Sequence, residues 1–167
     1  MSKKYINSFN LLKKNWDNFK SNPDNKKVRI RDAAHILSTN EASLLSTKVN
    51  DGVFYLSISN INAFLKELYS AHKLMFLVRN DFVVHENNLL SNDLTFLSDI
   101  ICDKTDQDNC FMEFDANKIV HAFYENKIHR DRSLESFQFF DIFGESIFKV
   151  YLKDHNSRVF SQIVDKY

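Results

Sequence analysis

Glycine and proline are scarce in this sequence, which has only Gly52, Gly144 and Pro23. A P-loop, a dinucleotide-binding fingerprint and a nucleophile elbow each need several glycines within a few residues, because their backbones turn tightly or approach a ligand closely. Two glycines that lie far apart cannot form any of these motifs. The enzyme classes that depend on them are therefore excluded.

The sequence also lacks a cysteine framework and an excess of charge. Cys102 and Cys110 form no CxxC pair, so neither a disulfide scaffold nor a cysteine-based zinc site is expected. The formal net charge is zero, with 22 basic and 22 acidic residues, which disfavours general binding to nucleic acids. No apolar run approaches the roughly 20 residues of a membrane span, and no Asn-x-Ser/Thr sequon occurs. We therefore expect a cytoplasmic protein without membrane insertion.

Helices are predicted mainly in the first 70 residues, where apolar side chains recur at spacings of three and four. The expected helices cover residues 5–20, 31–37, 41–45 and a segment that begins after Asn60. Either Thr39 or Asn40 is expected to cap the third of these helices. Another helix is expected from Ser157 to Val164.

Strand patterns dominate the rest of the chain. Strands are expected at residues 53–56, 73–78, 82–85, 94–98, 110–114, 118–124, 134–141 and 146–153, with a turn from Asp141 to Gly144 before the last one. Because helices come first and antiparallel strands follow, the predicted class is α+β. We expect one domain over residues 1–167, in which N-terminal helices and a C-terminal helix flank an antiparallel β-sheet.

Phenylalanine is abundant, with sixteen residues, although the overall hydrophobic content is an ordinary 44%. One interpretation is that phenylalanine takes the place of leucine in the core. The other is that some of these rings form a pocket for a flat apolar ligand.

Three basic or aromatic residues on predicted strands are candidate ligand-binding groups. Arg79 precedes Asn80 and Asp81 between two apolar half-strands, so it is either an exposed residue of a hairpin or a cation presented by a rigid sheet. Lys149 and Tyr151 alternate with apolar residues and share one strand face. That face is either the solvated one or one that turns both side chains toward a ligand.

The six histidines show no helical zinc pattern. His121 lies within an apolar strand candidate, so its imidazole is expected either in the core or facing a pocket. His129 begins the polar segment 129–132, which is either a solvated loop or a basic loop that binds the carboxylates of a ligand.

Three segments, in order, resemble the bacterial haem-utilisation family of hemin-degrading factors and smaller haem carriers (HemS/ChuX-like). The first comprises Asn22-Pro23, Val28-Arg-Ile-Arg-Asp-Ala-Ala-His-Ile-Leu37 and Asn40-Glu-Ala-Ser-Leu-Leu45. The second is Leu77-Val-Arg-Asn-Asp-Phe-Val-Val-His-Glu86. The third is Arg132-Ser-Leu-Glu-Ser-Phe-Gln-Phe-Phe-Asp141, followed by Gly144 and Phe148-Lys-Val-Tyr-Leu152. The resemblance spans about residues 22–155 and is closest to the N-terminal half of the two-half family members.

The resemblance implies an antiparallel sheet with flanking helices, haem b bound in a cleft against the sheet, and a homodimer that replaces the missing half. It places Arg79 on the distal side of haem, where its guanidinium binds an iron-bound water or a propionate. The stretch that corresponds to the family's axial histidine, about residues 49–58, contains no histidine. Chemistry alone offers replacements: His121 as the iron ligand, or His129, or His85 from a partner subunit.

The resemblance thus implies a cytoplasmic haem carrier or chaperone of the uptake pathway, with Arg79, His85, His121, His129, Lys149 and Tyr151 as haem-binding candidates. A haem-degrading enzyme or an inner-membrane haem transporter is an expected partner. Haem degradation by this chain is one alternative, although the sequence shows no flavin or nicotinamide signature. The other alternative is a family member that has lost haem binding and serves as an interaction or regulatory module.

Overall fold

The computed structural model describes residues 3–70, 74–89, 94–97, 100–104, 111–129, 132–152 and 157–167. The helices and 3-10 turns are α1 (Lys3–Ser21), η1 (Pro23–Asn25), α2 (Ile30–Ile36), α3 (Glu41–Ser46), α4 (Ile61–Ser70), η2 (Ala116–Lys118) and α5 (Ser157–Lys166). The strands are β1 (Val53–Leu56), β2 (Leu74–Arg79), β3 (Val84–Leu89), β4 (Leu94–Leu97), β5 (Ile100–Lys104), β6 (Phe111–Asp115), β7 (His121–His129), β8 (Arg132–Phe140) and β9 (Ser146–Leu152). The predicted α+β class, with helices at both ends of the chain, is confirmed.

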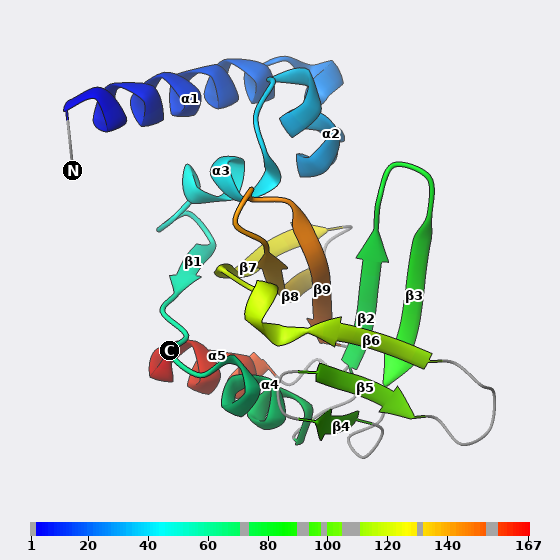
Figure 1. Ribbon diagram of the computed structural model, residues 1–167. Coiled ribbons are helices and arrows are strands. Elements are labelled where there is room, and N and C mark those ends of the chain that lie inside the picture. Colours follow the sequence, from blue (N-terminus) through cyan, green and yellow to red (C-terminus); the bar gives the residue numbers. More distant parts are fainter. Residues whose placement is uncertain are drawn as a thin grey trace.

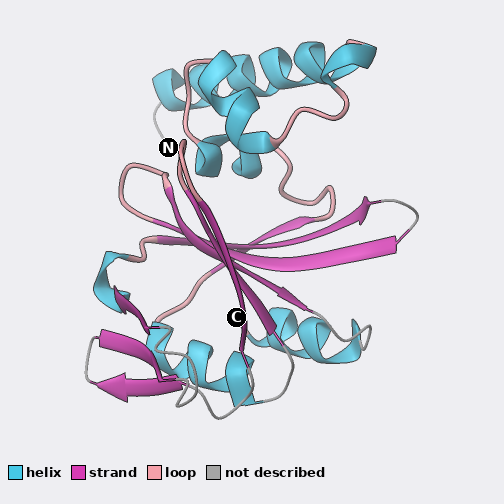
Figure 2. Cartoon of the chain, turned by 90° about the vertical axis from the view of Figure 1, so that its right-hand side faces the viewer, coloured by secondary structure: helices cyan, strands magenta, loops and turns pink. Residues whose placement is uncertain are grey.

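A six-stranded sheet forms the middle layer of the molecule, in the order β1-β7-β8-β9-β2-β3. Every pair of neighbouring strands in it is antiparallel. Helices α1–α3 lie on one side of this sheet, whereas α4, α5 and the small sheet β4-β5-β6 lie on the other (Figure 1, Figure 2). The two sides are called the α3 face and the α4 face of the sheet below. Among the described helices, none is both long and apolar enough to cross a membrane.

The α4 face carries the main hydrophobic core. Phe137 and Phe139 of β8 and Phe148 of β9 are at most 1% exposed and pack with Phe64 of α4 and Phe76 of β2. The rings of Phe76 and Phe148 stack with their centroids 4.4 Å apart, and Phe64 meets Phe137 edge-on at 5.3 Å. The interpretation that phenylalanine builds the core is therefore confirmed for these residues.

The α3 face has a smaller apolar core and a larger polar area. Ala42 and Leu45 of α3 pack on Val53, Phe123 and Phe140, which lie on the three strands at the β1 side of the sheet. Helix α1 covers α2 and α3 in turn, through a cluster of buried residues that consists of Trp16, Ala33, Ala34 and Leu44. The apolar contacts of α3 thus lie near one edge of the sheet.

Two predicted local signals fix the position of α3. The Asn40 side chain accepts a hydrogen bond from the backbone N–H of Ser43 at 2.8 Å, so Asn40, not Thr39, is its N-cap. Gly144, in the predicted turn before β9, has φ +78° and packs against Asn40, because an added Cβ would lie 2.3 Å from Asn40 Oδ1. The Gly144 carbonyl also accepts from the Ala42 N–H at 3.1 Å. This turn therefore positions α3 against β8 and β9.

Three strand predictions need correction. Residues 116–118 form a 3-10 turn, so β7 starts at His121 and extends through a polar stretch to His129 instead of covering 118–124. The second strand of the hairpin begins at Val84, not Phe82, because Asn80 accepts hydrogen bonds from the N–H groups of Phe82 and Val83. β5 has no counterpart among the predicted strands.

Candidate functional site

Three of the predicted binding residues lie on the α3 face of the sheet. Cross-strand partners in an antiparallel ladder point to the same face. Lys149 is paired with Gln138 of β8 on one side and Leu77 of β2 on the other, and Tyr151 is paired with Ser136 and Met75. Arg79 is two residues beyond Leu77 on β2, so its side chain points to the same face. The structure therefore brings Arg79, Lys149 and Tyr151 onto one surface, β9 and β2, which we call the β9–β2 surface.

A buried carboxylate borders the β9–β2 surface on its β8 side. Glu125 of β7 is 3% exposed and accepts hydrogen bonds from Lys48 at 2.8 Å, from Lys127 at 3.0 Å and from Gln138 at 2.9 Å. Burial by itself would raise the pKa of Glu125, but the charges of Lys127 and Lys48 outweigh it and lower this pKa to about 2. Glu125 is thus ionised at neutral pH, and it neutralises part of the positive charge around it.

A second buried carboxylate neutralises Lys149 itself. Glu41, the first residue of α3, is 2% exposed and forms a hydrogen-bonded ion pair with the Lys149 ammonium group. The Lys149 side chain is 12% exposed. This pair joins the helical layer to the middle of the sheet.

Other groups of the β9–β2 surface have open hydrogen-bonding capacity. Gln138 is 1% exposed and donates to Glu125 and Ser136, yet its buried Oε1 has no hydrogen-bond partner. Among the described residues, no hydrogen bond or ion pair is formed by the Arg79 guanidinium or the Tyr151 hydroxyl. Burial, together with the charges of Glu125 and Glu41, raises the pKa of Tyr151 to about 12, so its hydroxyl is a donor at neutral pH. Buried polar groups are rarely left unsatisfied, and an exception calls for an explanation such as a bound ligand or water.

Helix α2 reaches the end of β2 that carries Arg79. Arg31 donates to Asp81 in the β2–β3 turn at 2.8 Å, and His35 Nε2 lies 3.6 Å from the same carboxylate oxygen. The hydrogen bond from Arg31 lowers the pKa of Asp81. Residues from both layers therefore meet next to Arg79. His35 is not among the residues predicted from the sequence, because nothing in its local sequence places it near Arg79, 44 residues later in the chain.

The predicted histidines lie elsewhere. His121 belongs to the α3 face, but β8 and β9 separate its strand from that of Arg79, which corresponds to about 14 Å across the sheet. His85 is paired with Val78, whose side chain packs on the α4-face core, and is exposed on that opposite face. His129 ends β7 opposite Arg132, and its side chain lies outside the described part of the molecule. The structure thus brings none of these three together with Arg79.

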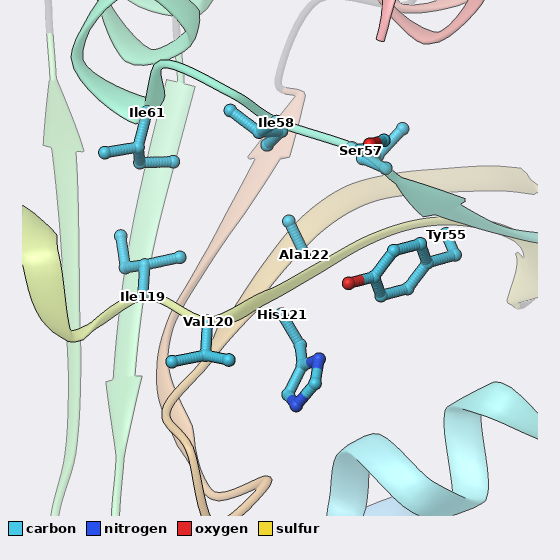
Figure 3. Close-up of a pocket in the computed structure, with 9 residues that line it drawn as sticks. Tyr55, Ser57, Ile58, Ile61, Ile119, Val120, His121 and Ala122 are labelled. Carbon is cyan, nitrogen blue, oxygen red and sulfur yellow. The ribbon is translucent and has the colours of Figure 1, made fainter.

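His121 lines a shallow hollow at the β1 edge of the sheet (Figure 3). The hollow has a volume of about 130 Å³, with Tyr55 and His121 on one side and Ile61 and Ile119 on the other. The ring centroids of Tyr55 and His121 are 6.3 Å apart. His121 is half-buried at this hollow, with its imidazole beside the Tyr55 ring. Within the described ranges, no group of three or more His, Cys, Asp and Glu side chains is arranged to hold a metal ion.

Comparison with known proteins identifies relatives of this fold. The family model of the haemin-degrading HemS/ChuX domain matches residues 38–167. No match was found among curated protein sequences.

Solved structures with a similar fold fall into two size classes. Holo-PhuS, a haem-binding protein from Pseudomonas aeruginosa, has a TM-score of 0.80 and 21% identity over 95% of this chain and 45% of PhuS. The haem-degrading enzyme ChuS from Escherichia coli O157:H7 has a TM-score of 0.81 and 21% identity over 95% of this chain and 46% of ChuS. The haem-binding protein ChuX has a TM-score of 0.72 and 10% identity over 93% of this chain and 97% of ChuX. The chain therefore spans about half of PhuS and ChuS, but it matches nearly the whole length of ChuX.

Proposed function

The chain belongs to the haemin-degrading HemS/ChuX domain family, as its sequence predicts, and from this premise we propose that it binds haem and acts as a haem carrier. The observation that carries the proposal is the open hydrogen-bonding capacity of Arg79 and Tyr151 beside Lys149 on the β9–β2 surface. Haem combines a flat apolar macrocycle with two carboxylates, so it needs apolar surface, donors for those carboxylates and an axial ligand.

The first two of these needs, apolar surface and donors, have counterparts on the β9–β2 surface. Met75 and Leu77, the partners of Tyr151 and Lys149, are partly exposed and offer apolar surface for the macrocycle. Arg79 offers a fork of donors for a propionate or for an iron-bound water. Tyr151, neutral because its pKa is raised to about 12, offers one further hydrogen bond.

The axial ligand is proposed from the positions of the histidines. Arg79 projects from the sheet, so a donor on the other side of a flat macrocycle must come from the helical layer or from a partner subunit. His35 of α2 lies beside Asp81, two residues after Arg79, and is our first candidate. His121 projects from the same sheet face as Arg79 and is a weaker one. His85 and His129 remain candidates only as ligands supplied across a subunit interface.

A proposed assembly follows from the need for a donor opposite Arg79. The chain spans about half the length of PhuS and ChuS. We propose a homodimer in the cytoplasm, in which the partner subunit reaches the side of the macrocycle opposite Arg79, with an inner-membrane haem transporter as donor or a haem-degrading enzyme as acceptor. Sedimentation velocity, with and without haem, tests the dimer.

Haem titration of the purified apo protein, followed by its Soret band, tests the proposed binding. We expect saturable binding near one haem per chain, weakened by Arg79→Ala. Arg29→Ala, which removes an exposed arginine at the start of α2, is the matched control and should bind haem like the unaltered protein. Broad absorbance without saturation, or equal effects of both variants, would contradict this site.

Carriage and degradation are separated by one further assay. A carrier passes haem intact to apomyoglobin and keeps its Soret band in the presence of ascorbate and oxygen. A degrading enzyme loses the Soret band under the same conditions, because it requires an electron donor and an open iron position. Loss of the Soret band at the rate of catalytic turnover would mean that the chain is a haem-degrading enzyme and not a carrier.

A further inference from the structure

The Glu41–Lys149 pair differs from the other buried ion pair of the α3 face. Glu125 accepts from two lysines and one amide, so removing any one donor leaves it partnered. Within the described part of the chain, Glu41 and Lys149 are paired only with each other, and neither side chain forms a second hydrogen bond. Exchanging the carboxylate partner of Lys149 therefore requires only one ion pair to break.

Lys149 is also the cation at the centre of the β9–β2 surface. Its cross-strand partners are Gln138, whose buried Oε1 lacks a partner, and Leu77. Tyr151 follows two residues later on the same strand face, and Arg79 lies beyond Leu77 on the next strand. A carboxylate that approached the open donors of Arg79 and Tyr151 would meet an ammonium group already occupied by Glu41.

We propose that Glu41 occupies the carboxylate-binding point of this surface and that a carboxylate of the bound ligand takes its place on Lys149. The inference rests on the proposed function, since it assumes that the β9–β2 surface binds haem. It adds a specificity residue from α3: Glu41 makes each carboxylated ligand compete for Lys149, whereas a ligand without carboxylates meets no such competition.

The exchange leaves Lys149 paired with one carboxylate before and after the ligand binds. The charge of Glu41 already acts on Arg31 of α2, which is hydrogen-bonded to Asp81 at 2.8 Å, so the displaced carboxylate would share that cation with Asp81. Because an unpaired buried charge is costly, this shared cation offsets part of the cost of displacing Glu41.

The test compares haem with its dimethyl ester, which keeps the iron and the macrocycle but has no free carboxylate. Glu41→Gln preserves the size of the side chain and frees Lys149. We expect it to tighten haem binding by roughly tenfold, the scale on which a like charge opposes an incoming carboxylate, and to leave binding of the diester unchanged. Lys149→Gln should weaken haem binding and leave diester binding unchanged.

Two results would overturn the inference. If Glu41→Gln weakens haem and diester alike, Glu41 only positions α3 and Lys149. If the double variant E41Q/K149Q still prefers haem over the diester as the unaltered protein does, Lys149 is not the carboxylate-binding point. The double variant removes both charges and provides the test should a single variant unfold. Failure of the proposed function is distinct from both results, because the unaltered protein would then bind neither haem nor the diester saturably.

Discussion

Replacement of Glu125 by glutamine tests the electrostatic account of the α3 face. Glutamine copies the shape of the protonated carboxyl, so the variant measures what ionisation contributes. A pKa lowered from 4.5 to about 2 corresponds to about 3 kcal/mol of folding free energy. Since domains are stable by roughly 5–15 kcal/mol in total, Glu125→Gln is expected to remove a large part of the stability at pH 7.

The pH dependence of that loss has a definite sign. The folded protein binds the Glu125 proton less tightly than the unfolded chain, so the stabilisation is complete above pH 4.5 and disappears as the pH falls through about 2. Urea unfolding followed by circular dichroism at pH 7, 5, 4 and 3 should show the difference between the two proteins shrinking with acidity. Asp17→Asn, at an exposed position of α1, is the control and should change little. A difference that stays constant across this pH range would refute the reasoning.

Two further substitutions test how the fold supports the site. Gly144→Ala should lower the free energy of unfolding, measured in urea, by about 1–3 kcal/mol, because Gly144 has φ +78° and its added Cβ would lie 2.3 Å from Asn40 Oδ1. Unchanged stability would mean that this turn does not hold α3. Phe148→Ala should lower the free energy of unfolding by about 3–5 kcal/mol, because the ring is 1% exposed and lies 4.4 Å from Phe76 and 4.6 Å from Phe139, centroid to centroid. Phe148→Leu should recover most of that stability. An equal loss in both variants would argue against a cavity as the cause.

Periodicity in the sequence was sufficient to predict the helices and several strands. The stripe of residues 5–20, the cap at Asn60 and the turn at Gly144 are local signals, and the structure contains α1, α4 and the β8–β9 hairpin at these places. The extension of β7 through Glu125 to His129 was not predictable in the same way. A charged residue inside a strand is favourable here because Lys127 and Lys48 pair with it, and Lys48 lies 77 residues away in the sequence.

The candidate site was predictable in part for the same reason. Alternation along β9 predicts that Lys149 and Tyr151 share a face, and the register confirms it. Alternation cannot tell which helices cover that face, so neither Glu41 on Lys149 nor His35 beside the turn after Arg79 could be found from the sequence. Conversely, the apolar neighbours of His121 suggested a ligand position, yet the sheet order places its strand three strand spacings from that of Arg79.

The two faces of the sheet differ in a way that suits a protein with an exchangeable ligand. On the α4 face, stacked phenylalanine rings hold β8, β9 and β2 in a fixed register, which keeps Lys149 and Tyr151 in place whether or not a ligand is bound. On the α3 face, Lys48 and Lys127 are paired with Glu125, and Lys149 is paired with Glu41, which leaves Arg79 as the open cation among the described residues of the β9–β2 surface. Charge compensation of this kind lowers the affinity for a dianionic ligand without removing the groups that recognise it. It therefore favours release as well as uptake, which is what the proposed carrier function requires.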